Sequence, residues 1–220
     1  MMEGEMNRFI QYIKKLAKES GEAFRTFPAS MACATAFALV TIFRIQLDWP
    51  QQEPYNFLFN CLHWSFAFGA LLNLALTTAA QSRKGERNAF WIANAAGMLA
   101  VAVVFALLYK FGVPDPADVN ARYLSVSVIA TARVAVGMFV SVLMFVIFAE
   151  RKDRSPAFAE SFFMLHKALF LALIYGSVLM IGTSGVAGAF QALLYNDMSS
   201  KVYMYISTIV GLLSFTIFAG

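Results

Sequence analysis

The residues of this sequence that could do chemistry are the few polar side chains within its long apolar runs. An ionisable group inside a membrane-spanning segment is energetically costly, so each one is a functional hypothesis by default. Arg133 is the clearest, because it lies deep in an apolar run and shares one helical row with Ser125 and Gly137. We therefore expect Arg133 to lie near the middle of a bilayer and to face other helices instead of lipid.

The partner of Arg133 stays open at this level, because the cores of the apolar runs contain no Asp or Glu. His63 of another run reaches a comparable depth, and the candidate ligand or partner site comprises Arg133, His63, Asn60 and Ser125. The guanidinium could bond helix carbonyls and side chains such as Asn60, or meet a carboxylate of another chain. It could also hold an anionic ligand or lipid phosphate, or extend to the nearest interface.

Two amides and a group of small residues predict contacts between helices. Asn73 and Asn94 fall at similar depth, so we expect a hydrogen bond between them, worth about 0.6–2 kcal/mol. Small residues let helices approach closely, and those expected to do so are Gly137, Gly182, Ser184, Gly185 and Gly188. The alternative for the last four is an unwound segment that lines a ligand site, as in transporters with broken helices.

The sequence shows no catalytic motif and no cofactor site. It contains no nucleophile elbow, phosphate-binding loop or dinucleotide fingerprint. Its two histidines, His63 and His166, fall on opposite sides of the predicted membrane, which argues against a His-rich metal site. Cys33 and Cys61 lie at different depths, so no disulfide is expected. We predict a protein that is not an enzyme and needs no cofactor.

The composition indicates that membrane-spanning helices position these residues. The 220 residues are 60% hydrophobic and 14% charged, against about 25% charged in soluble domains, so soluble and disordered classes are excluded. A spanning helix needs about 20 apolar residues. Six segments qualify, namely 28–47, 54–80, 89–111, 122–149, 158–195 and 202–220. We predict an all-α integral membrane protein with a six-helix transmembrane bundle over residues 26–220.

The basic residues predict the orientation of this bundle. Most of the 17 Lys and Arg residues flank the loops on one side, and basic residues near span ends are retained in the cytoplasm. We therefore expect both termini in the cytoplasm. The net charge of +4 thus reflects topology, and we expect no nucleic-acid binding, which would need an exposed basic patch with interleaved aromatic residues.

Residues 1–25 predict an amphipathic helix that lies on the membrane surface. Apolar residues recur at three- and four-residue spacing from Met6 to Ala17, which makes one apolar helix face. The basic residues that would meet anionic lipids of the cytoplasmic leaflet are Arg8, Lys14, Lys15 and Lys18. The alternative is a polar tail that precedes the first span.

Several short stretches of the sequence resemble a known family. They are 27–28 (FP), 86–87 (ER), 122–126 (RYLSV), 158–167 (FAESFFMLHK), 169–188 (LFLALIYGSVLMIGTSGVAG), 192–195 (ALLY), 201–203 (KVY) and 214–220 (SFTIFAG). These stretches resemble the bacterial membrane proteins grouped as domain-of-unknown-function family 4153. The resemblance implies a location in the bacterial inner membrane and supplies no catalytic residues. Family members are usually longer, so it implies either a short member or an amino-terminal half.

Two functions of different class follow from these observations. The first is a non-catalytic scaffold or accessory subunit that acts through helix–helix and lipid contacts, with a second copy or another membrane subunit as partner. The second is a transporter or channel-like protein that binds a small anionic or amphipathic ligand near Arg133. The small-residue face and the lack of an enzyme motif favour the first.

Overall fold

The computed structural model describes residues 21–48, 51, 53–82, 87–113, 126–149 and 157–220. Within these ranges every regular element is helical, as predicted. The elements are α2 (Pro28–Gln46), the 3-10 turn η1 (Glu53–Tyr55), α3 (Asn56–Ser82), α4 (Arg87–Phe111), α5 (Val128–Phe148), α6 (Ala157–Leu193) and α7 (Lys201–Ala219). The predicted surface helix with Arg8, Lys14, Lys15 and Lys18 lies outside the described residues, as does Ser125.

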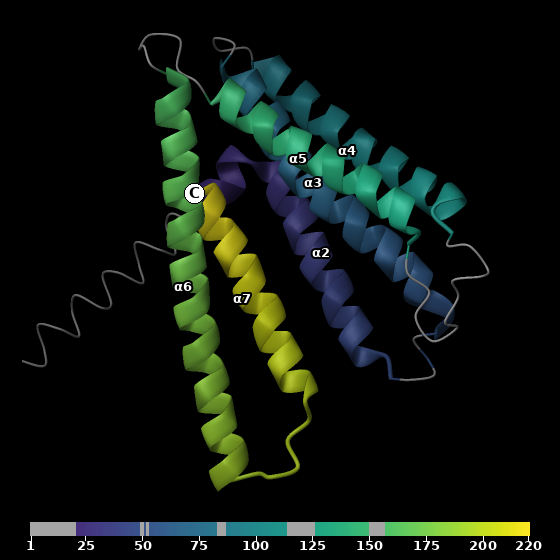
Figure 1. Cartoon of the computed structure of the whole chain (residues 1–220), viewed down its shortest axis with the longest axis vertical. Coiled ribbons are helices and arrows are strands. Elements are labelled where there is room, and N and C mark those ends of the chain that lie inside the picture. The colour runs from purple at the N-terminus through teal and green to yellow at the C-terminus, as the bar shows by residue number, and fades with distance from the viewer. Residues whose placement is uncertain (1–20, 49–50, 52, 83–86, 114–125, 150–156) are drawn as a thin grey trace, which may run out of the picture.

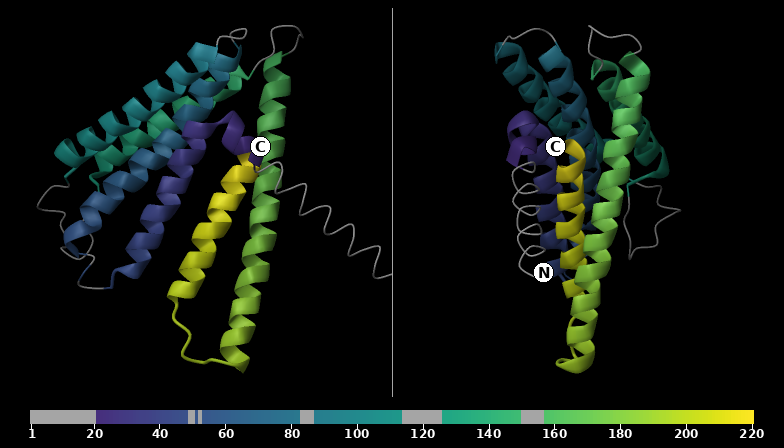
Figure 2. Two further views of the ribbon diagram at one scale, coloured as in Figure 1. Left: turned by 180° about the vertical axis from the view of Figure 1, so that it is seen from behind. Right: turned by 90° about the vertical axis from the view of Figure 1, so that its left-hand side faces the viewer.

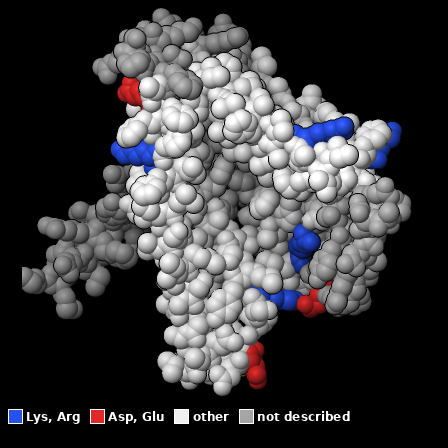
Figure 3. Space-filling model, viewed as in Figure 1, with Lys and Arg blue, Asp and Glu red and all other residues white. Residues whose placement is uncertain are grey.

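Six of these helices are long and apolar enough to cross a membrane, as the sequence predicted. They are α2 to α7, and each holds an 18-residue window with at most two charged residues. Such a window is wide enough for most of a hydrocarbon core about 30 Å thick. Figure 3 shows the same property on the surface, where a broad uncharged area covers most of the length of α6.

The start of α5 differs from the predicted span. Residues 126 and 127 are not helical, and the helix begins at Val128. Ser127 is the N-cap, and its hydroxyl oxygen accepts a hydrogen bond from the backbone N–H of Ala130 at 3.4 Å. Arg133 is therefore the sixth residue of α5, about 8 Å from the helix start. The expected position of Arg133 near the middle of its span is wrong.

Helix α3 lies at the centre of a four-helix group, where it packs against α2, α4 and α5 (Figure 1). Small residues allow the closest approach. A Cβ added at Gly69 would collide with Val101 of α4 and Cys33 of α2, so glycine at this position brings three helices together. Cys33 and Cys61 are both buried and free.

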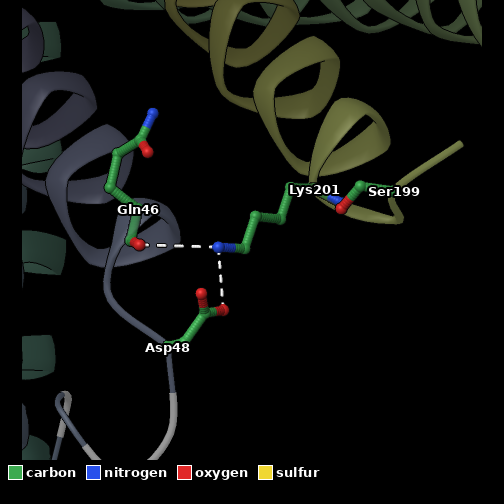
Figure 4. Close-up of polar contacts among 4 residues, drawn as sticks. All are labelled: Gln46, Asp48, Ser199 and Lys201. Atoms are coloured by element: carbon green, nitrogen blue, oxygen red, sulfur yellow. Dashed lines mark hydrogen bonds and ion pairs between the residues drawn. The ribbon is translucent and has the colours of Figure 1, made fainter.

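Helices α6 and α7 form a hairpin at the side of this group, as the two views of Figure 2 show. The hairpin packs on the group mainly through α7 against α2, with a smaller contact between α6 and α5. One end of α7 is also tied to α2 by charge (Figure 4). Lys201 Nζ lies 2.8 Å from Asp48 Oδ1 and donates to the Gln46 carbonyl at 3.4 Å. The hairpin is thus held to the first long helix at both its face and its end.

Candidate functional site

A polar network joins the C-terminal part of α2 to the N-terminal part of α3. Arg44 of α2 donates from Nη1 to Asn60 Oδ1 at 3.0 Å and from Nη2 to Asn56 Oδ1 at 3.4 Å. His63 Nε2 lies 2.9 Å from Thr41 Oγ1. Thr41 is three residues before Arg44, and His63 is three residues after Asn60. The network therefore follows the register that two antiparallel helices must have.

The hydrogen atoms of this network can be assigned by counting donors and acceptors. The Thr41 hydroxyl has one hydrogen, which it donates to the Phe37 carbonyl at 2.9 Å within its own helix. The oxygen of Thr41 must then accept from His63, so Nε2 of His63 carries a hydrogen. The His63 ring also packs on Phe37, with 4.7 Å between ring centroids. The His63 side chain is thus positioned from two sides by α2.

These contacts divide the predicted four-residue site. Asn60 and His63 lie with Arg44 and Thr41 at the α2–α3 interface, and they make no hydrogen bond with Arg133. The grouping of Asn60 and His63 with Arg133 is therefore wrong, because α3 presents these two residues to α2 and other residues to α5. Arg44 donates to two amide oxygens of α3, and these hydrogen bonds compensate part of its charge between the two helices.

Arg133 instead lies in a groove between α4 and α5. The groove has a volume of about 430 Å³. Its other lining residues are apolar or small: Phe68, Val104, Leu107, Leu108, Phe111, Ala130, Val134 and Gly137. The Arg133 side chain is exposed, and it forms no hydrogen bond or ion pair with any residue that the structure describes. The groove thus combines an apolar wall with a guanidinium that has no partner among the described residues.

The two predicted amides are buried but do not bond to each other. Asn94 Oδ1 accepts from the backbone N–H of Ala29 in α2 at 3.2 Å and from Thr77 Oγ1 in α3 at 3.4 Å. Asn73 donates from Nδ2 to the Gly69 carbonyl at 2.8 Å. The predicted Asn73–Asn94 bond is wrong, because the start of α2 competes for the Asn94 carbonyl. Asn94 nevertheless links three helices.

Asn73 has a different neighbour on α4. A Cβ added at Gly97 would overlap the Asn73 side chain, so Asn73 Oδ1 lies directly against the backbone of α4. That oxygen is buried and has no hydrogen-bond partner among the described residues. Gly97 therefore allows α3 and α4 to approach closely at the position of a buried amide.

The predicted small residues fall into two groups. Gly137 of α5 packs on Phe68 of α3, where an added Cβ would lie 3.0 Å from the ring. A Cβ added at Gly188 would lie 3.5 Å from the Tyr203 hydroxyl. Ser184 Oγ is buried without a partner in the described part of the chain. Gly182 and Gly185 have open space around their Cα atoms. These two glycines therefore pack against nothing within the described residues.

The residues that sequence reasoning missed are Arg44, Thr41 and Asn56. Arg44 lies close to the end of an apolar run, where a basic residue is typical of a span boundary. The signal was a matching spacing in two adjacent runs. Thr41 and Arg44 are three residues apart, and Asn60 and His63 have the same separation. Two polar stripes with equal spacing on antiparallel neighbours predict a shared interface.

The hairpin encloses two further cavities against the four-helix group. One, of about 510 Å³, lies between α2, α3 and α7, and the other, of about 690 Å³, lies between α5, α6 and α7. Leu71 and Phe215 line both cavities. The hydroxyls of Thr41 and Thr208 reach the first cavity but donate to carbonyls of their own helices. The wall of that cavity is therefore suited to hydrocarbon.

The polar groups of α2 and α3 are in contact with one another. Arg44, Asn60, Thr41 and His63 satisfy one another across two helices, and no described hydroxyl forms a nucleophile–His–carboxylate arrangement with His63. In the ranges that the structure describes, His, Cys, Asp and Glu form no cluster of three that could hold a metal ion. Comparison with protein-family models, curated proteins and solved structures finds no match to this chain.

Proposed function

We propose that this chain is a non-catalytic scaffold or accessory subunit of a bacterial inner membrane, with both termini in the cytoplasm. The observation that carries the proposal is the exposed face of α6. This helix has 37 residues and packs mainly against α7. No charged residue occurs in it after Lys167, and Gly182 and Gly185 have nothing within 4 Å of an added Cβ. The resemblance to domain-of-unknown-function family 4153 supports the location.

The partner that best fits this face is a second copy of the chain. Small residues on a membrane helix permit close backbone approach, which drives helix association through packing. A face without charge offers nothing that would select a partner of complementary charge. A two-fold arrangement places the same stripe of Gly182 and Gly185 on both sides of the contact, so it is self-complementary.

The proposal is tested by measuring the oligomeric state of the full chain in lipid nanodiscs. Gly182→Leu and Gly185→Leu together should convert dimers to monomers, because each adds bulk to the proposed contact. Gly211→Leu is the matched control, since Gly211 of α7 also has open space around it. A native chain that is monomeric, or variants that dimerise as well as the native chain, would contradict the proposal. If a different membrane subunit is found bound to α6, that subunit is the partner and the second copy of the chain is not.

The groove at Arg133 favours a second candidate function. A transporter or channel-like protein would bind a small anionic or amphipathic ligand there and move it across the membrane. This function requires water or ligand access to the guanidinium, and Arg133 is exposed. Uptake of an anionic substrate into proteoliposomes that is lost in Arg133→Leu would support this candidate. If sealed vesicles that contain the native chain show no flux of any tested anion, the transport function is excluded and a ligand that stays bound is the remaining interpretation.

A further inference from the structure

The two walls of the groove at Arg133 are matched stretches of antiparallel helix. On α4 the lining residues run from Val104 to Phe111, and on α5 they run from Ala130 to Gly137. Each stretch covers about 10 Å along its helix. The end of α4 and the start of α5 lie together, because Ser127 N donates to the Gly112 carbonyl at 2.8 Å. The groove therefore begins near one end of the bundle and runs inward.

The position of Arg133 directs its charge towards that same end. Side chains on a helix tilt towards the helix N-terminus, and the N-terminus of α5 is only five residues away. Long basic side chains near helix ends place their charge at the interface while their methylene stems stay among apolar groups. The guanidinium is thus directed towards the end of the bundle, where we expect the phosphates of one leaflet, and the apolar groove continues inward to Val104 and Gly137.

We propose that this groove binds a phospholipid, with its phosphate on Arg133 and an acyl chain between α4 and α5. A guanidinium can bond two phosphate oxygens at once. The wall below it is formed by aliphatic and aromatic side chains, among them Leu107 and Phe68. The volume of about 430 Å³ lies within the range of about 300–1,000 Å³ that is typical of small-molecule pockets. The groove therefore matches an amphiphile whose anion and hydrocarbon are directly joined.

A second copy of the chain fits this groove less well than a lipid does. The six described spanning helices contain one acidic residue, Glu160, which lies in the first turn of α6. A helix from another copy would therefore bring no carboxylate to Arg133 within its apolar length, and the cation would stay uncompensated. This inference shares one premise with the second candidate function, namely that a ligand binds at Arg133. It does not require transport, because the lipid can stay bound.

The test is lipid binding to the delipidated full chain, measured by native mass spectrometry with phosphatidylglycerol as the probe. Arg133→Gln should weaken the apparent affinity by about tenfold, which corresponds to about 1.4 kcal/mol. Leu107→Trp should also weaken it, because Leu107 lines the groove and is 52% exposed, so the larger ring fills the groove without entering the core. Inorganic phosphate at millimolar concentration should not displace the lipid.

Lys110→Gln is the matched control, because Lys110 is a nearby cation of α4 that does not line the groove. It should change the affinity less than twofold. Equal binding by the native chain and Arg133→Gln would overturn the proposal, as would equal losses in Lys110→Gln and Arg133→Gln. If inorganic phosphate displaces the lipid, the ligand of the groove is a free anion and the lipid proposal is overturned. Loss of lipid binding with dimers intact would leave the scaffold role standing, since the two measurements are separate.

Discussion

Arg44 of α2 donates a hydrogen bond from Nη1 to Oδ1 of Asn60 in α3, over 3.0 Å. The contact joins a charged group to a neutral amide between two membrane-spanning helices. A charge-assisted hydrogen bond is stronger than a neutral one, and it keeps its strength where water is excluded. Arg44 and Asn60 therefore fix how α2 and α3 are aligned, together with the contact between Thr41 and His63 one turn away.

The first prediction concerns the coupling of Arg44 and Asn60. Arg44→Met and Asn60→Leu should each lower stability, and the double variant should lose less than the two single losses combined. Residues in direct contact show coupling energies of about 0.5–3 kcal/mol. Equilibrium unfolding in mixed micelles measures the stability of the native chain, the two single variants and the double variant. Arg133→Met is the control, because Arg133 has no partner in the described ranges; additive losses for Arg44 and Asn60 would contradict the coupling.

The second prediction concerns Asn94, which caps a helix other than its own. Phe27 is the N-cap of α2 and provides no side-chain hydrogen bond, so the Ala29 N–H uses the Asn94 oxygen instead. Asn94→Leu leaves this buried donor without an acceptor and should cost about 1–3 kcal/mol. Thermal unfolding of the purified chain measures the loss. Asn88→Leu, at an exposed position of the same helix, should leave the midpoint almost unchanged.

The third prediction contrasts two glycines that differ in their surroundings. Gly97→Ala places a methyl group against the Asn73 side chain and should destabilise the chain by about 1–3 kcal/mol, the typical cost of overpacking. Gly182→Ala meets open space and should stabilise the monomer by about 0.5–1 kcal/mol, since alanine favours a helix interior. Both values come from unfolding under monomeric conditions. If Gly97→Ala proves more stable than Gly182→Ala, the close contact between Asn73 and Gly97 is absent in solution.

The fourth prediction concerns the tie between Lys201 and Asp48. Their side chains are 31% and 71% exposed, so water and salt weaken the 2.8 Å ion pair. Asp48→Asn should cost at most about 1 kcal/mol at low salt. The difference from the native chain should vanish near 1 M salt, where the screening length is about 3 Å. A difference that persists at high salt would indicate that Asp48 acts through hydrogen bonds instead.

The spanning helices were predictable because each is a long apolar run, and run length depends on local sequence alone. The start of α5 was harder, because Tyr123, Leu124 and Val126 are apolar enough to extend the run towards Arg122. Ser127 was the overlooked signal, since a serine three residues before a helical N–H can cap it. Because α5 begins six residues later than predicted, Arg133 lies in the second turn of α5 and not near the middle of that helix.

The polar contacts were less predictable, because depth in the membrane does not say which neighbour a helix faces. The sequence places His63 at a depth comparable to that of Arg133, but α3 turns both Asn60 and His63 towards α2. Asn73 and Asn94 also have similar depth, and their rotation about the helix axes gives each a different partner. Apolar runs carry little rotational information, so helix pairing had to come from the three-dimensional structure.

The contact between α2 and α7 has a consequence for how the protein is made. Lys201 Nζ and the Gln46 carbonyl are 155 residues apart in sequence, and α2 leaves the ribosome long before α7. The face of α2 that packs against α7 in the folded protein must therefore contact lipid or the insertion machinery while α3, α4, α5 and α6 are synthesised. A ribosome stalled before Lys201 would hold a chain in which α2 is inserted but still lacks α7 as its neighbour.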